Sequence, residues 1–133
     1  MTLLLDTHVW IWSQEAPEKL GELTTRLLTD RQNVLYVSTT STLEIARLLM
    51  VGTVALSEPL TSWVSETLRA LECGTMEISH QIAIEAYSLP GNFHKDPADR
   101  ILVATARIYD LTLVTMDERI LQYSHVTSQD ARL

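Results

Sequence analysis

A chain of 133 residues, 46% of them hydrophobic, matches one compact domain over residues 1–133, and its single cysteine, Cys73, excludes an internal disulfide and a zinc site built from cysteine pairs. No apolar run approaches the roughly 20 residues of a membrane span, and the N-terminal stretch does not look like a leader, so we expect a soluble, cytoplasmic protein without membrane contact. The formal net charge of -7 argues against a protein that binds nucleic acid mainly by neutralising phosphates with lysine and arginine.

The N-terminal part of the chain predicts a strand, a helix and a second strand. Thr2–Leu5 is a short apolar run typical of a buried strand, and Asp6 follows its C-terminal end. Pro17–Asp30 carries leucines at helical spacing, with Pro17 tolerated in the first turn. Val34–Val37 is rich in β-branched and aromatic residues, which favours a second strand.

Two further helices are expected in the middle of the chain. Ser38–Thr42 supplies several possible caps for a helix that ends before Gly52 and has Glu44 in its first turn. Its predicted inward stripe is apolar: Leu43, Ala46, Leu49 and Met50. Ser57 can cap a helix that runs to about Glu72 and is stopped by Gly74. Its predicted inward residues are Leu60, Trp63, Val64, Leu68 and Leu71.

The next segment is expected to form a strand, a short helix, a loop and a longer capped helix. Thr75–Ile78 predicts a strand, His80–Ser88 a short helix, and Leu89–Lys95 a loop. Asp96 then caps a helix that has Asp99 at its third position. The apolar stripe of that helix is Ile101, Leu102, Ala104, Thr105 and Ile108.

The C-terminal segment completes the alternation. Leu111–Thr115 predicts a strand, Asp117 follows it, and the tail from His125 to Leu133 can add an edge strand around Val126. Strands that alternate with helices indicate an α/β fold of three layers, with a mostly parallel sheet covered by helices on both faces. Ligands bind such sheets beyond the C-terminal ends of the strands, where Asp6 and Asp117 are expected.

Four carboxylates are expected to converge at this edge of the sheet. Asp6 and Asp117 follow buried strands, and Glu44 and Asp99 lie near the starts of two helices that can point toward the same rim. Carboxylates about 4 Å apart repel by roughly 4 kcal/mol per pair at an effective dielectric constant near 20. A divalent cation removes that penalty and turns the cluster into a centre that binds phosphate.

The chemistry of an oxygen-only ligand set follows from the ions that prefer it. Such ligands favour Mg²⁺ or Mn²⁺ over zinc. A water activated by the ion can attack a phosphodiester, while positive charge stabilises the leaving oxygen. The sequence therefore predicts metal-dependent phosphodiester hydrolysis.

Each of these acids also has a purely structural interpretation. Asp96 and Asp99 can both serve as helix N-terminal acids, Glu44 can be an ordinary first-turn acid, and Asp117 can be a turn or cap residue. Asp6 is the hardest to explain in this way, because it follows three leucines directly.

Other polar and aromatic residues give weaker indications. The four histidines have no metal-pair spacing, so solvated or core roles are favoured over catalysis: His8, His80, His94 and His125. The three tryptophans are assigned to the core or a dimer interface rather than to base stacking: Trp10, Trp12 and Trp63. Arg100 either orients a carboxylate, contacts phosphate, or forms a surface ion pair.

Four segments together resemble the successive motifs of PIN-domain proteins: Leu3–Val9, Glu44–Ala46, His94–Ala106 and Leu113–Asp117. Their order and spacing cover nearly the whole chain, and the most similar subgroup is the VapC-type toxins of bacterial toxin-antitoxin pairs. The resemblance implies a parallel sheet of about five strands, a Mg²⁺ or Mn²⁺ site, cleavage of RNA, homodimerisation, and inhibition by a small antitoxin protein.

Carried over residue by residue, the resemblance assigns the acidic set of the family to Asp6, Glu44, Asp99 and Asp117. Thr115 matches a hydroxyl residue that holds a carboxylate or a water. Asp96 is expected to contact the residues that bind the ion and not the ion itself. The apolar run Leu48–Met50 departs from the family pattern, which has a basic residue after the glutamate, so RNA contact from this helix is in doubt.

Two other functions compete with the nuclease. A non-catalytic binding module would keep the fold and lack a site carboxylate, but all four are present. A phosphatase of the haloacid-dehalogenase type needs a second acid two residues after the first, and His8 occupies that position.

Overall fold

A five-stranded parallel sheet runs through the centre of the computed structural model, which describes all residues from Met1 to Leu133. The strand order is β3-β2-β1-β4-β5, and every neighbouring pair is parallel. The strands are β1 (Thr2–Leu5), β2 (Val34–Ser38), β3 (Gly74–Met76), β4 (Thr112–Thr115) and β5 (Ser128–Asp130). This confirms the predicted parallel sheet, and the predicted edge strand forms two residues after Val126.

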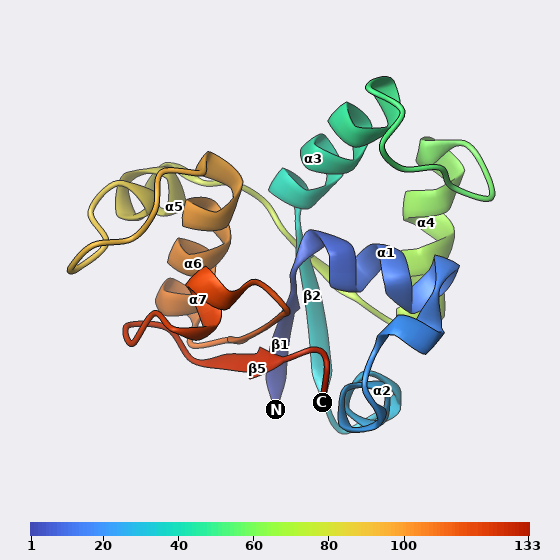
Figure 1. Ribbon diagram of the computed structural model, residues 1–133, viewed down its shortest axis with the longest axis horizontal. Coiled ribbons are helices and arrows are strands. Elements are labelled where there is room, and N and C mark those ends of the chain that lie inside the picture. The colour runs from blue at the N-terminus through green and yellow to red at the C-terminus, as the bar shows by residue number, and fades with distance from the viewer.

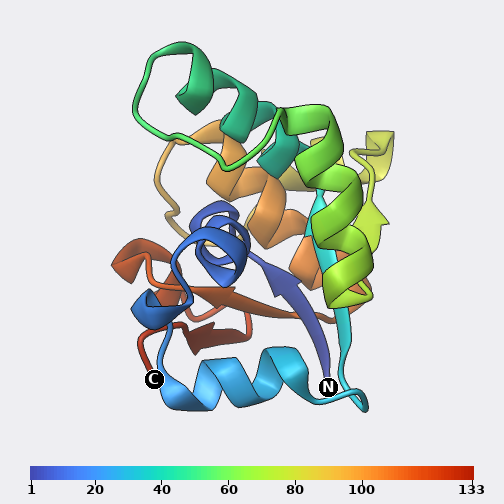
Figure 2. The same ribbon diagram turned by 90° about the vertical axis from the view of Figure 1, so that its right-hand side faces the viewer.

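Helices cover both faces of the sheet, as Figures 1 and 2 show. One face carries α1 (Thr7–Glu15), α2 (Glu22–Thr29), α3 (Thr39–Met50) and α4 (Leu60–Leu71), and the other carries α5 (His80–Ala86), α6 (Pro97–Tyr109) and α7 (Glu118–Leu121). Leu3 and Leu5 of β1 pack into the first core, and Leu4 packs into the second. This is the alternation of a strand buried on both sides, and it confirms the three-layer α/β fold.

The prediction of one helix over Pro17–Asp30 is wrong. A short 3₁₀ turn, Pro17–Lys19, is followed by a break at Gly21 and then by α2. A Cβ atom at Gly21 would lie 2.0 Å from the carbonyl carbon of Leu133, and the Gly21 N–H donates to the carbonyl of Ala131 at 2.9 Å. The C-terminus therefore packs against the break, and Figure 2 shows it beside the start of α2.

The predicted inward face of α3 is also wrong. Ser38 caps this helix as expected, but its buried residues are Thr40, Ser41, Ile45 and Leu48. Leu43 and Met50 are 70% and 80% exposed, whereas Leu49 does pack against the core. Because α3 begins at Thr39, Glu44 lies in its second turn and not in its first.

Helix α4 has the predicted face and different ends. Trp63 is fully buried on it, but the helix starts at Leu60, because the Ser57 N–H and hydroxyl donate to the Glu15 carboxylate instead of capping it. Glu72, in the left-handed region with φ +51°, ends the helix, and Gly74 begins β3. A Cβ atom at Gly74 would lie 2.9 Å from the ring of Tyr36, so this glycine serves strand pairing.

The tryptophans lie where the core interpretation predicts. Trp10 and Trp63 are 0% and 1% exposed, with ring centroids 5.1 Å apart, and the Trp10 indole N–H donates to the Thr67 hydroxyl at 3.0 Å. Trp12 is partly buried against the same core. Cys73 is half-buried, and burial raises its pKa to about 12. No helix combines the length and apolar character needed to span a membrane.

Candidate active site

The four predicted carboxylates line one pocket of about 290 Å³. Asp6 and Asp117 come from the C-terminal ends of β1 and β4, Glu44 comes from α3, and Asp99 comes from α6. The other lining residues are His8, Val9, Asp96, Met116 and Arg119. The structure therefore brings together all four acids at the edge of the sheet where ligands of parallel α/β folds bind.

Asp6 is held by the strands on which it lies. Its backbone N–H donates to the carbonyl of Val114 at 3.0 Å, which extends the pairing of β1 with β4. Its carboxylate accepts from the Thr7 N–H at 2.7 Å and from the Thr115 hydroxyl at 2.6 Å. Burial raises the pKa of Asp6, so the ionised form has a cost that a cation can offset.

Thr115 connects the acids at the ends of β1 and β4. The side chain is fully buried, and its hydroxyl donates to Asp6 while it accepts from the Asp117 N–H at 3.0 Å. One hydroxyl thus fixes one carboxylate and the backbone of the other. The position matches the expectation that Thr115 holds a carboxylate.

Glu44 is fixed through a threonine that the sequence analysis did not single out. The Thr7 hydroxyl lies 2.6 Å from Glu44 Oε1 and 2.9 Å from Ser41 Oγ. A hydroxyl has one proton, so Thr7 can donate to Glu44 and accept from Ser41. The signal in the sequence was its place directly after Asp6, at the start of α1.

The pKa of Asp99 is shifted by burial and by the neighbouring carboxylates. Asp96 caps α6, and its carboxylate accepts from the Asp99 N–H at 3.0 Å. Burial, followed by the charges of Asp6, Asp96, Asp117 and Glu44, raises the pKa of Asp99 to about 8. Without a cation, this carboxyl group therefore holds a proton at neutral pH.

Asp117 is paired with the one arginine of the pocket wall. It caps α7 by accepting from the Arg119 N–H at 2.9 Å, and the Arg119 guanidinium lies 3.2 Å from its second oxygen. Partial burial opposes ionisation of Asp117, but the hydrogen bonds from Arg119 outweigh it and lower the pKa of Asp117. Arg119 thus adds positive charge at the mouth of an otherwise acidic pocket.

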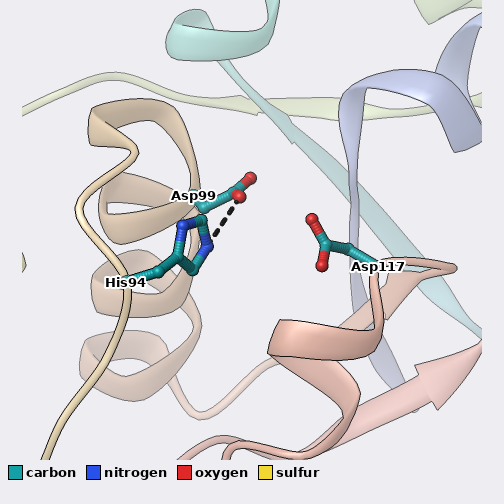
Figure 3. A group of neighbouring side chains, drawn as sticks. All are labelled: His94, Asp99 and Asp117. Carbon is teal, nitrogen blue, oxygen red and sulfur yellow. Dashed lines mark ion pairs between the residues drawn. The ribbon is translucent and has the colours of Figure 1, made fainter.

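His94 joins the site, although the sequence analysis favoured a solvated or core role for it. Its Nε2 lies 2.9 Å from Asp99 Oδ2. Donor atoms of His94, Asp99 and Asp117 all lie within 4.8 Å of one another, and Figure 3 shows the three side chains facing a common space. Burial, and then the positive charge of Arg119, lower the pKa of His94. The signal in the sequence that could have indicated this role is that His94 lies two residues before Asp96, which caps α6.

Arg100 lies behind the site and does not touch a carboxylate. Its guanidinium donates to the backbone carbonyls of Ala86, Phe93 and His94 at 2.7, 2.9 and 3.0 Å. Neither a carboxylate-orienting contact nor a surface ion pair is present, so both of those interpretations were wrong. Arg100 instead fastens the loop that precedes α6 onto the end of α5.

The donor set fits a hard divalent cation. Ligands of an octahedral ion with bonds of about 2.1 Å lie roughly 3 to 4.2 Å apart, and carboxylate oxygens of Asp99 and Asp117 lie within 4.8 Å of each other. Asp6 and Glu44 lie outside that group, and their carboxylates accept from the hydroxyls of Thr115 and Thr7, each at 2.6 Å. Carboxylate oxygens are the ligands that Mg²⁺ and Mn²⁺ prefer, so a shared site is chemically consistent.

Comparison with known proteins identifies a family and a relative. The family model described as the PIN domain matches residues 3–126. Ribonuclease VapC22 of Mycobacterium tuberculosis is 32% identical over 124 residues, which is 93% of both chains.

Solved structures share the fold at lower identity. VapBC2 from Rickettsia felis, bound to a DNA fragment from the promoter, has a TM-score of 0.70 at 15% identity and covers 97% of this chain and 98% of its own. DNA-bound VapBC from Salmonella typhimurium has a TM-score of 0.70 at 18% identity and covers 98% of both chains. Both similarities concern the arrangement of helices and strands.

Proposed function

The chain belongs to the PIN-domain family, within which it is similar to a VapC ribonuclease, and on this premise we propose that it is an endoribonuclease dependent on Mg²⁺ or Mn²⁺. The observation that carries the proposal is the convergence of Asp6, Glu44, Asp99 and Asp117 on one pocket. We also propose that residues 1–133 form a single domain of this family, since the matched region covers most of the chain.

A bound Mg²⁺ or Mn²⁺ would activate a water and offset the negative charge that develops on the phosphate. Asp6, Asp99, Asp117 and Glu44 are proposed to hold the ion. Asp6 needs little reorganisation, because two hydrogen bonds already fix both of its oxygens.

The remaining roles concern Glu44 at the cation and Arg119 at the phosphate. Glu44 uses one oxygen to accept from Thr7 and would hold the ion through its other oxygen. Arg119 places a guanidinium at the pocket wall, where it can meet a phosphate oxygen. The acidic balance of the whole chain, -7, is consistent with affinity for RNA that depends strongly on the bound cation.

We propose further that the protein acts as the toxin of a toxin-antitoxin pair and binds a small antitoxin protein. The support is that two solved structures with the same fold, from Rickettsia felis and Salmonella typhimurium, are VapBC structures. The net charge of -7 favours a basic partner. Homodimerisation is part of the same proposal, because Leu43, Met50 and Val51 leave apolar surface exposed at α3.

Cleavage of pooled cellular RNA by the purified protein tests the enzymatic proposal. We expect cleavage in Mg²⁺ or Mn²⁺, none with EDTA, and a loss of about 10³-fold or more in Asp6→Asn, because the buried anchor of the cation is removed. Glu66→Gln, which removes a charge from the exposed side of α4, serves as the control and should cleave like the unmodified protein.

Circular dichroism spectra must show that both variants are folded. A folded, metal-loaded protein that cleaves no RNA would contradict the proposal and favour a PIN-fold binding module that has no catalytic activity.

A further inference from the structure

His94 presents a buried ring nitrogen to the carboxylate cluster. Its Nε2 has no hydrogen-bond partner with acceptable geometry, although Asp99 Oδ2 is only 2.9 Å away. The N–H···O angle, and not the N···O distance, therefore prevents a hydrogen bond between these two atoms. The second torsion of an aspartate is broad, so a modest rotation of the Asp99 carboxyl group would align the two atoms.

The other ring nitrogen determines which atom carries the proton. The Asp96 N–H donates to His94 Nδ1, at 3.4 Å. A nitrogen that accepts a hydrogen bond carries no proton, so the ring is neutral and its proton sits on Nε2. Nε2 can then donate to Asp99, and it cannot at the same time offer a lone pair to a cation.

Arg100 and Phe93 fix the position of the His94 ring. The Arg100 guanidinium donates to the backbone carbonyls of Phe93 and His94, and the Phe93 ring lies 4.5 Å from the imidazole between centroids. The His94 side chain is 18% exposed, so solvent does little to orient it. Arg100 and Phe93 thus hold the imidazole at the first turn of α6.

We propose that His94 is a positioning residue that donates its Nε2 proton to Asp99 Oδ2 and thereby turns Oδ1 toward the cation. The proposal rests on the proposed metal-dependent function and deepens it. Asp99 lies next to Asp117 and shares the pocket with Asp6 and Glu44, so an ionised Asp99 without a fixed orientation could turn toward several partners. A donor on one oxygen removes that freedom, as hydrogen bonds to metal-binding carboxylates generally do.

Binding of Mn²⁺ to the full chain, measured by calorimetry, tests the role of His94. We expect His94→Phe to weaken Mn²⁺ binding by about 10- to 100-fold. His94→Gln should recover most of the loss, because the glutamine amide can donate from a similar position. His80→Phe removes an exposed imidazole on α5 that does not line the pocket, and it should stay within about threefold of the unmodified protein.

Spectroscopy on the unmodified protein keeps the test decisive if His94→Phe does not fold. Nitrogen-15 NMR should find the His94 proton on Nε2, and pulsed electron paramagnetic resonance of the Mn²⁺ complex should show no directly bound histidine nitrogen. A directly bound nitrogen, a proton on Nδ1, or unchanged affinity in a folded His94→Phe would overturn the proposal and leave the nuclease intact. Failure of the unmodified protein to bind Mn²⁺ would overturn both.

Discussion

Asp99→Asn is expected to stabilise the metal-free protein at pH 8 while it abolishes RNA cleavage. Asp99 lies among carboxylates, and burial together with their charges raises its pKa to about 8. An asparagine has nearly the same shape and never ionises. The variant therefore keeps the fold, loses the repulsion, and loses a proposed ligand of the cation.

The pH dependence of this effect has a definite sign. The folded pKa of Asp99, about 8, lies above its value of 3.8 in the unfolded chain, so the folded state binds more protons between these two pH values. Stability from this group is complete below pH 3.8 and is lost as the pH rises toward 8. Allowing for solvent screening of a partly exposed group, we expect the variant to gain about 2 kcal/mol over the unmodified protein at pH 8 and little at pH 4.

Urea unfolding at both pH values in EDTA, together with the RNA cleavage assay, measures the two effects. Glu66→Gln removes the same amount of charge from an exposed helix surface and should change neither quantity. If Asp99→Asn were less stable than the unmodified protein at pH 8, the carboxylates would not be crowded in the way described.

Trp10→Ala is expected to destabilise the fold by about 3–5 kcal/mol, which corresponds to a fall in Tm of about 10 °C or more. The side chain is fully buried between α1 and α4, where it packs on Trp63 and donates to Thr67. Truncation would leave a cavity and remove the partner of a buried hydroxyl.

Trp12→Ala on the same helix is the matched control. Trp12 is only partly buried, with Lys19 lying 5.3 Å over its ring, so we expect a loss of about 1–2 kcal/mol. Calorimetric unfolding of the two variants separates them. Equal losses would mean that the Trp10–Trp63 contact is not the centre of this core.

The sheet and the four acids could be predicted because their signals are local. Each buried strand is a short apolar run, and Asp6 and Asp117 stand at strand ends where a carboxylate has no place in the core. The Asp96 cap also fixed the start of α6, so Asp99 could be placed in its first turn. Parallel pairing then made convergence the natural expectation.

The helix directly after Asp6 could not be predicted in the same way. Val9, Trp10, Ile11 and Trp12 form a continuous apolar run of β-branched and aromatic residues, which is more typical of a strand. The segment is helical because it packs against β1, α3 and α4 at once, and three of the four residues are buried. Tertiary packing overrode local propensity here.

The rotation of α3 shows a second limit. Two apolar faces are available on this helix, one with Leu43 and Met50 and one with Ile45 and Leu48. The structure buries the second, and this rotation brings Glu44 to the Thr7 hydroxyl. Periodicity alone does not choose between two such faces.

The side chains that contact the acids could not be predicted from the sequence, for a related reason. Thr7, Thr115 and His94 lie near the acids in space because of the fold, and distances in the folded chain rather than spacing in the sequence reveal their contacts. Of these, only Thr115 was expected to hold a carboxylate, and that expectation came from resemblance to a family.

The central claim is that carboxylates from four separate elements share one divalent cation. The most direct test is the affinity for Mn²⁺, measured by calorimetry on the unmodified protein, on four single variants and on Glu66→Gln as control. The four variants are Asp6→Asn, Glu44→Gln, Asp99→Asn and Asp117→Asn. The account predicts saturable binding that each of the four weakens by about tenfold or more and that Glu66→Gln leaves unchanged. No binding to the unmodified protein, or equal affinity in all six proteins, would contradict it.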